Sequence, residues 1–313
     1  MLYPDFEELL QLGSRIGKLD LASRRPVLSI VSGDHRSPFR GRGLEFEEVR
    51  EYVHGDDVRN IDWRVTARTG RPHLKLFSEE RERSVLICTD VNHTMRFGTR
   101  GTFKSVQAAK AAALLGWAAN RGNNRIGGSF FGNVPDGKMF FSPVRSRRSL
   151  WRMLKQLCDR GDYTDSYTPL EEHLRYLNKA VPSGSLVFII SDFLVISEHL
   201  KKRLSDLHRH ADIVLVAIND PADAMLPAAG PVMFTDYTGQ KVGINTLDTK
   251  GGQAYRHYWD ENRRKLQTII HSLGLSCVFL STNQDVVLEL GRAIKQMGHR
   301  GGRGHGRPAL TAS

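Results

Sequence analysis

The chain has 313 residues, of which 40% are hydrophobic and 25% are charged, and its formal net charge is +11. These proportions are ordinary for a globular protein in water, and the length allows one large core or two modest ones. No apolar run reaches the ~18 residues that a membrane span needs, so we expect no membrane insertion. The acidic start MLYPDFEELL lacks a basic segment followed by an apolar one, so we expect no signal peptide.

The cysteines indicate the compartment of the protein, and the distribution of charge indicates the kinds of partner it could bind. Cys88, Cys158 and Cys277 are far apart, odd in number and match no zinc spacing, which predicts reduced thiols in a cytoplasmic protein. Residues 1–83 carry equal numbers of acidic and basic side chains, so the whole positive charge lies in residues 84–313. Such a surface is either simply basic, or it binds an acidic partner or nucleic acid.

The first 83 residues predict a mixed extension. Apolar residues recur at helical spacing over residues 4–21, which predicts a helix. The same spacing predicts a short helix over residues 44–53. Residues 61–67 and 73–80 predict two strands around the turn RTGRP.

From Ser84 onward, strands and helices alternate. Strands are predicted over residues 84–89, 125–131, 138–141, 185–191, 212–218 and 275–281. Helices are predicted over residues 102–120, 147–158, 169–180, 197–210, 251–273 and 284–297, and a small hairpin lies within 231–245. Strands such as SLVFIIS are apolar throughout, which indicates burial on both faces. We therefore predict an α/β fold, an open, mainly parallel sheet covered by helices on both faces.

The predicted organisation has three parts. Residues 1–83 form an N-terminal extension, residues 84–297 form the α/β domain, and residues 298–313 form a tail. The tail is rich in glycine and arginine and nearly devoid of apolar residues, so we expect it to be disordered.

Oxygen-bearing side chains follow two of the predicted strands. Asp90 ends the first strand of the domain, and Asp192 ends the strand SLVFIIS. Ligands of open parallel sheets bind beyond the carboxyl ends of the strands, so these carboxylates converge if their strands are neighbours. Asn92 and Thr94 in the first loop, and Thr168 in another, add neutral oxygens. Such an oxygen-only set suits Mg²⁺.

Two other interpretations of these residues stay open. Thr168-Pro169-Leu170-Glu171 matches a capping box with proline at the first helical position, which would explain Thr168 without a metal. The segment DVNHT is one residue from D-x-D-x-T, the nucleophile loop of haloacid-dehalogenase-type phosphatases. In that interpretation Asp90 attacks phosphorus, but Asn92 cannot transfer the proton that the second aspartate transfers.

The same residues resemble the metal-ion-dependent adhesion site of von Willebrand factor A domains, whose motif is D-x-S-x-S. Asp90 matches the aspartate, Asn92 stands for the first serine, and Thr94 stands for the second. Thr168 and Asp192 are similar in position to the third and fourth elements of that site. The resemblance implies a von Willebrand factor A-like domain with an adhesion-type metal site that holds Mg²⁺.

A second resemblance lies upstream of this domain. The segment from Gly41 to Glu80 resembles the signature of the bacterial domain of unknown function 58 family. Together the two resemblances cover roughly residues 33–290, which is most of the chain. Members usually accompany MoxR-type AAA+ ATPases in systems thought to mature or remodel other proteins. No enzymatic activity is implied.

Charged residues of this signature surround a tryptophan. The candidate partner-binding residues here are Asp56, Asp57, Arg59, Asp62, Trp63, Arg64 and Arg68. One interpretation is an ion-pair network that stabilises the local fold; the other is a docking surface for the ATPase, since Trp and Arg often dominate binding. In the basic half, Arg148 and Arg152 on a predicted helix are candidates for contact with an acidic partner.

These observations predict a non-enzymatic adaptor. It would bind an unknown protein client through the adhesion-type site and work with a MoxR-type AAA+ ATPase. The alternatives are a basic nucleic-acid-binding protein, for which there is little aromatic interleaving, and a Mg²⁺-dependent phosphatase.

Overall fold

The computed structural model describes residues 3–15, 44–54, 56–79, 83–134, 139–159, 167–235 and 241–300. The chain divides into two compact units. The α/β unit contains the described residues 3–15 and 83–300, and the hairpin unit contains those between 44 and 79. The predicted boundary at residue 83 separates the same regions, except that the first helix belongs to the α/β unit.

The centre of the α/β unit is a sheet that, within the described residues, has six strands in the order β10-β7-β6-β3-β4-β5. Its strands are β3 (Ser84–Asp90), β4 (Arg125–Phe131), β5 (Met139–Val144), β6 (Ser185–Ser191), β7 (Ala211–Asn219) and β10 (Ser276–Ser281). Only the β4–β5 pair among them is antiparallel. The chain therefore runs outward from β3 in one direction and returns to β6 on its other side. That reversal places a topological switch point between β3 and β6.

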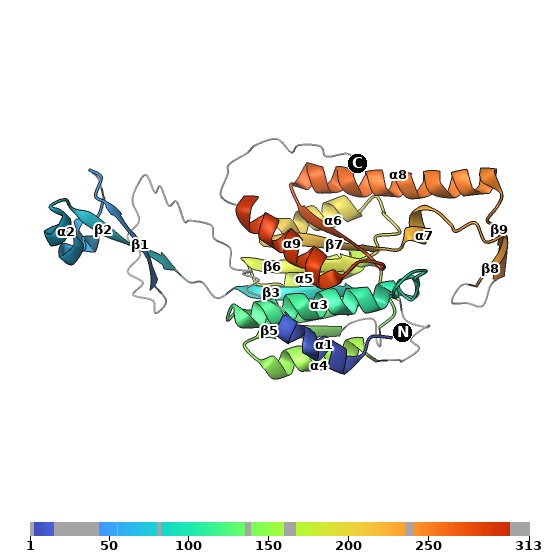
Figure 1. Cartoon of the computed structure of the whole chain (residues 1–313), viewed down its shortest axis with the longest axis horizontal. Helices are drawn as coiled ribbons and strands as arrows, with labels where there is room; N and C mark the ends of the chain where they lie inside the picture. Colours follow the sequence, from blue (N-terminus) through green and yellow to red (C-terminus); the bar gives the residue numbers. More distant parts are fainter. Residues whose placement is uncertain are drawn as a thin grey trace. The chain divides into compact units, whose positions relative to one another are not determined.

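Helices cover both faces of this sheet (Figure 1). One face is covered by α1 (Phe6–Arg15), α3 (Lys104–Arg121), α4 (Arg147–Leu157) and α9 (Val286–Arg300). The other face is covered by α5 (Leu170–Ala180), α6 (Leu200–His208) and α8 (Thr249–Leu273). In β3, Val85 and Ile87 belong to the first core, and Leu86 and Cys88 belong to the second. The predicted fold class is thus confirmed.

Helix α1 is packed tightly against α3. Leu9 and Leu12 are buried, and the indole N–H of Trp117 donates to the Leu9 carbonyl at 3.0 Å. Residues 16–21, which the sequence also assigned to this helix, lie outside the described residues. The contact explains why α1 belongs with the sheet rather than with the segment that follows it.

Two small elements follow β7 in the chain. The predicted hairpin is confirmed as β8 (Pro231–Thr235) paired with β9 (Lys241–Asn245). The four-residue helix α7 (Pro221–Ala224) was not predicted. Asp220 is its N-cap and forms a capping box with Asp223: the side chain of each residue accepts a hydrogen bond from the backbone N–H of the other. A single short turn of this kind carries too few apolar positions for a periodicity argument.

The prediction of a helix over residues 44–53 was wrong. Residues Leu44–Glu51 form strand β1, which pairs antiparallel with β2 (His73–Glu79). The register shifts between Phe46 and Glu48, which adds one residue to the strand. In a regular strand, apolar residues on one face are two positions apart. The extra residue of the bulge puts the apolar residues Phe46 and Val49 three positions apart in sequence, which is the spacing typical of a helix.

The prediction of a strand over residues 61–67 was also wrong. Residues Trp63–Thr69 form helix α2, preceded by the 3₁₀ turn η1 (Val58–Asn60). The Asp62 carboxylate accepts hydrogen bonds from the N–H groups of Arg64 and Val65, and Gly70 ends the helix with φ +72°. These caps outweigh the strand preference of Ile61, Trp63 and Val65. The strand predicted over residues 73–80 is confirmed as β2.

Helix α9 extends through Arg300, so residues 298–300 are helical rather than part of a disordered tail. The rest of that predicted tail, residues 301–313, lies outside the described residues. No helix in the described part of the chain combines the length and apolar character that crossing a bilayer demands.

Candidate functional site

The carboxyl ends of β3 and β6 form the centre of the candidate site. Asp90 is the last residue of β3, and Asp192 follows β6, its neighbour in the sheet. The Ser191 hydroxyl donates to Asp90 Oδ2 at 2.6 Å, which joins the two strand ends. Burial and, next, the Asp192 carboxylate raise the pKa of Asp90 to about 7. The two strand-end acids therefore lie at the same edge and interact electrostatically.

Gly132 brings a further segment to Asp90. Its N–H donates to the Thr168 carbonyl at 2.9 Å, and its own carbonyl accepts from the Thr168 N–H at 2.8 Å. Gly132 has φ +92°, and a Cβ there would lie 2.7 Å from the Asn92 nitrogen and 3.0 Å from Asp90 Oδ1. Glycine thus allows the Thr168 segment to approach the loop that follows β3.

The structure does not form the alternative capping box at Thr168. Helix α5 begins at Leu170, and the residue in the cap position is Pro169, where no side-chain cap hydrogen bond is made. Thr168 is buried beside Gly132 instead. Proline fixes its own φ and cannot donate a backbone hydrogen bond, which suits this entry into the helix.

Asn92 and Thr94 occupy the loop after β3. The Asn92 N–H donates to Asp90 Oδ1 at 2.9 Å, and Thr94 lies in the 3₁₀ turn η2 (His93–Met95). The Asn133 side chain accepts from the N–H of His93 at 3.2 Å and ties this turn to the end of β4. All five predicted oxygen ligands thus come from segments at the carboxyl edge of the sheet.

Lys104 is the functional candidate that sequence reasoning missed. It is 1% exposed, and its Nζ lies 2.8 Å from Asp223 Oδ1 and 3.3 Å from Asp192 Oδ2. The Phe97 ring centroid lies 5.5 Å from the same nitrogen. There was little signal for it in the sequence, because α3 is apolar on nearly all sides and periodicity does not distinguish Lys104 from Lys110.

Asp220, which follows β7, extends the polar network toward β10. It accepts from the Thr99 N–H at 2.8 Å, from the Thr99 hydroxyl and from the Thr282 hydroxyl, the last two at 2.5 Å. Burial alone would raise the pKa of Asp220, but the hydrogen bonds from Thr282 and Thr99 outweigh it and lower that pKa. The Asp220 N–H donates to Asp223 Oδ2 at 2.7 Å. Polar residues therefore line the ends of β3, β6, β7 and β10.

A cavity of about 70 Å³ opens beside Asp90 on the α1, α3 and α4 side of the sheet. Its polar lining includes Asp90, Asn92, Asn133 and Thr89. The Thr89 hydroxyl is buried and has no hydrogen-bond partner among the described residues. The cavity is large enough for water or for a small polar group.

The two carboxylates among the predicted magnesium ligands already have partners within the protein. Within the described residues, no group of three or more His, Cys, Asp or Glu side chains is arranged to hold a metal ion. The Asp192 carboxylate is already paired with the Lys104 ammonium, and both Asp90 oxygens accept hydrogen bonds from protein groups. Magnesium binding stays a prediction.

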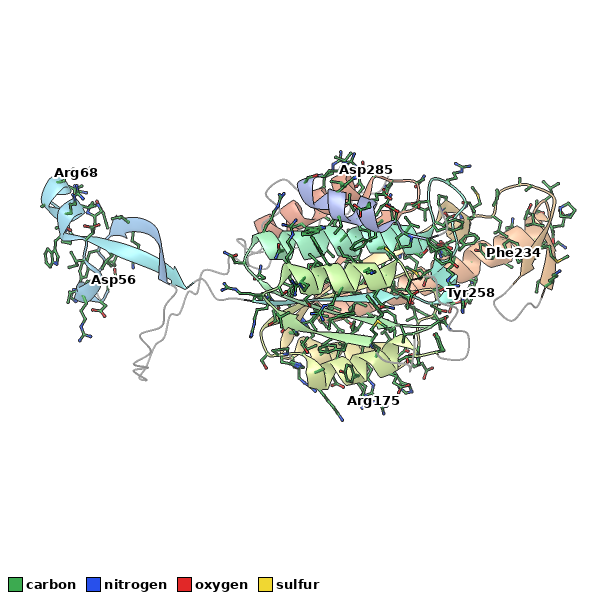
Figure 2. All side chains as sticks on the ribbon, turned by 90° about the horizontal axis from the view of Figure 1, so that it is seen from below. Asp56, Arg68, Arg175, Phe234, Tyr258 and Asp285 are labelled. Carbon is green, nitrogen blue, oxygen red and sulfur yellow. The ribbon has the colours of Figure 1, made fainter. Side chains whose placement is uncertain are left out.

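In the hairpin unit, the acidic signature residues serve the local fold. Asp56 forms a bidentate ion pair with Arg50 at 2.7 and 2.9 Å, and these hydrogen bonds lower the pKa of Asp56. Asp57 caps η1 and Asp62 caps α2. Figure 2 shows Asp56 and Arg68 on this unit.

The other signature residues face solvent. Trp63 is 71% exposed. Its basic neighbours Arg59, Arg64 and Arg68 are also exposed. The three acids therefore have local partners in the hairpin unit, and the tryptophan and the three arginines are open to solvent.

On α4, Arg148 and Arg152 are exposed beside Trp151, which is 41% exposed. The Arg147 guanidinium lies 5.2 Å from the Trp117 ring centroid and 5.6 Å from that of Trp151. The helix carries no acidic residue, so this face is positively charged.

Taken together, the doubly wound sheet and its polar carboxyl edge define an α/β protein with a candidate site at the switch point. The chain belongs to the family described as "Protein of unknown function DUF58", whose model matches residues 48–266. Three curated relatives, all named uncharacterized, are 27% identical over 293 residues, with 91% of this chain and 89% of the relative covered. They are Mb1516 of Mycobacterium bovis and MT1527 and Rv1480 of two Mycobacterium tuberculosis strains.

Two solved structures are similar at low identity. One is an aerotolerance-related membrane protein from Bacteroides fragilis, 12% identical, with a TM-score of 0.43, covering 70% of this chain and 99% of that chain. The other is a von Willebrand factor type A protein from Catenulispora acidiphila, 11% identical, with a TM-score of 0.36, covering 73% of this chain and 44% of that chain.

Proposed function

We propose that this protein is a non-enzymatic adaptor that binds a partner protein at the carboxyl edge of its sheet. The observation that carries the proposal is the convergence of Asp90 and Asp192 at the switch point, beside a cavity that a polar side chain can enter. Ligands of open α/β sheets bind at such a point. The partner would insert a side chain there while its surface covers the surrounding loops.

The arrangement around Asp90 supports binding more than phosphoryl transfer. A phosphatase of the haloacid-dehalogenase type needs an acid two residues after its nucleophile, and that position holds Asn92. Both oxygens of Asp90 accept hydrogen bonds within the protein, which lowers their nucleophilicity.

The proposal places the adaptor in the cytoplasm as a partner of a MoxR-type AAA+ ATPase. The resemblance of residues 41–80 to the family signature motivates this partner. Exposed Trp63, with Arg59, Arg64 and Arg68 nearby, supports the hairpin unit as the docking surface. The basic face of α4 supports an acidic client or an acidic ring surface as the second contact.

Asp90→Ala tests the role of the carboxyl edge. Tagged full-length protein is used to capture partners from native cytosol with and without ATP, and captured proteins are identified by mass spectrometry. We expect Asp90→Ala to lose the client and to keep the ATPase, because the ATPase docks on the hairpin unit.

Asp206→Ala is the matched control, because Asp206 lies near the end of α6 that leads into the start of β7 and is paired with Arg209 at 2.9 Å. If the wild type, Asp90→Ala and Asp206→Ala captured every partner equally, the proposal that a partner binds at the carboxyl edge would be wrong.

A further inference from the structure

The carboxylates at the end of the sheet accept hydrogen bonds from the protein itself. Asp90 accepts from the Asn92 N–H and from the Ser191 hydroxyl. Asp192 accepts from the Leu194 N–H at 3.2 Å through one oxygen and from Lys104 through the other. Asp223 likewise accepts from the Asp220 N–H and from Lys104. Each carboxylate oxygen therefore has an internal partner.

The position of Lys104 needs a reason, because it is unfavourable for an isolated ammonium. The side chain is 1% exposed, and burial of an unpaired charge is strongly destabilising. Lys104 is also the first residue of α3, where the helix dipole disfavours a positive charge. The carboxylates of Asp192 and Asp223 are the groups that make this position favourable.

A divalent ion on the same carboxylate would be repelled. An ion bound to Asp192 Oδ2 at ~2.1 Å would lie within roughly 5.4 Å of the Lys104 nitrogen, since that nitrogen is 3.3 Å from the same oxygen. Two cations at such a separation inside a protein destabilise each other unless further carboxylates are added. Among the described residues, Asp90 and Asp223 are the acids that interact with Asp192 or share its lysine.

We propose that Lys104 is the resident cation of this site and takes the role that a divalent ion has in a metal-dependent adhesion site. The ammonium holds Asp192 and Asp223 in place, so the carboxyl edge is formed without magnesium. This inference rests on the proposed function only in identifying the edge as a partner-binding surface. It predicts that a partner binds there without a metal bridge.

The test compares Mg²⁺ binding by the whole chain before and after removal of the ammonium. The variants are Lys104→Met and, as the matched control, Lys110→Met. Lys110 lies on the same helix and pairs with Glu8 at 2.5 Å, away from the carboxyl edge. Thermal unfolding is followed by circular dichroism in 10 mM MgCl₂ and in NaCl of equal ionic strength, after treatment with EDTA.

We expect Mg²⁺ to leave the melting temperature of the wild type and of Lys110→Met unchanged. We expect Lys104→Met to gain Mg²⁺ binding, because Asp90, Asp192 and Asp223 are then short of positive charge. An ion present at about ten times its dissociation constant would raise the melting temperature of a unit of this size by roughly 3–6 °C.

Two results would overturn the inference. One is a saturable Mg²⁺ effect on the wild type that Asp192→Asn abolishes, and the other is no gain of Mg²⁺ binding in Lys104→Met. If Lys104→Met does not fold, Lys104→Gln removes the charge and keeps a hydrogen-bond donor for the two carboxylates, and the same two outcomes apply. Partner capture is measured separately, so failure of the proposed function would leave the Mg²⁺ result unaffected.

Discussion

Gly132 is the residue whose backbone conformation determines how closely the segments of the site approach. It has φ +92°, and an added Cβ would lie 2.7 Å from the Asn92 nitrogen. An alanine there would have an unfavourable positive φ, and its Cβ would clash with a backbone atom that can shift only at an energetic cost.

We expect Gly132→Ala to lower the free energy of unfolding more than the matched variant Gly184→Ala. Gly184 has φ +79°, but a Cβ there would contact nothing within 4 Å. The backbone conformation accounts for about 1–2 kcal/mol in each variant, and overpacking adds about 1–3 kcal/mol in Gly132→Ala alone. Urea unfolding measures both values, and equal losses would contradict the close approach.

His173 on α5 gives the fold a dependence on pH. Its Nε2 lies 2.8 Å from the Ser129 hydroxyl, and its ring stacks on Phe131 with centroids 5.2 Å apart. Burial lowers the pKa of His173 to about 4. Because the unfolded chain takes up this proton near pH 6.5 and the folded protein does not, stability falls as the pH drops from about 6.5 toward 4.

We expect the wild type to lose about 2 kcal/mol more than His173→Gln between pH 7.5 and pH 5. The comparison with the variant isolates the histidine, because the raised pKa of Asp90 changes stability in the opposite direction in both proteins. Urea unfolding at the two pH values is the measurement. The same loss in both proteins would show that His173 is not the titrating group.

Among single residues, the strand-end rule predicted part of the site. Asp90 and Asp192 could be predicted because each directly follows an apolar strand of a predicted parallel sheet. Lys104 was missed because lysine in a helix is ordinarily exposed, and its carboxylate partner Asp223 lies more than a hundred residues away in a helix of one turn. Only the fold brings these two charges together.

At the level of elements, α4 begins with charges that oppose its own stability. Arg147 and Arg148 lie in its first turn, which contains no acidic residue. Positive charge near a helix N-terminus interacts unfavourably with the helix dipole. The arrangement is understandable if these residues serve binding of an acidic partner, because function often opposes stability at a binding surface.

Arg148→Glu should therefore raise the free energy of unfolding by about 0.3–1 kcal/mol and weaken capture of an acidic partner. Arg152→Glu lies beyond the first turn, so it should weaken capture without the gain in stability. Arg175→Glu on α5, on the opposite face of the sheet, is the control for a change of net charge. A nucleic acid recovered with the wild type, and lost from both α4 variants, would instead favour the nucleic-acid alternative.

The elements that sequence periodicity predicted well are those buried on both faces or along one long stripe. β6 matches its predicted bounds because its apolar run is bordered by polar turns, and β4 also matches. β1 and α2 were assigned the wrong type because a bulge and an aspartate cap, rather than side-chain burial, decide their conformation. Periodicity over seven or eight residues cannot separate these causes.

At the scale of the whole molecule, the chain combines a large α/β unit with a small unit that exposes a tryptophan. No residue of α2 is buried, and Trp63 is 71% exposed. Trp and Arg are the residue types most often found at binding hot spots, and Trp63 has the exposed Arg59, Arg64 and Arg68 near it in sequence. Substitution of Trp63 therefore tests the proposal that the hairpin unit binds the ATPase and the α/β unit binds the client.

We expect Trp63→Ala to reduce capture of the AAA+ ATPase at least tenfold, which corresponds to about 1.4 kcal/mol of binding free energy. Its free energy of unfolding should change by less than about 0.5 kcal/mol, because an exposed side chain contributes little to folding. Leu288→Ala on α9 is the control, since Leu288 is 57% exposed on the α/β unit. Client capture should survive in Trp63→Ala and disappear in Asp90→Ala. If either variant lost both partners, the surfaces for the ATPase and the client would not be separate. If both variants kept both partners, neither surface would be involved in capture.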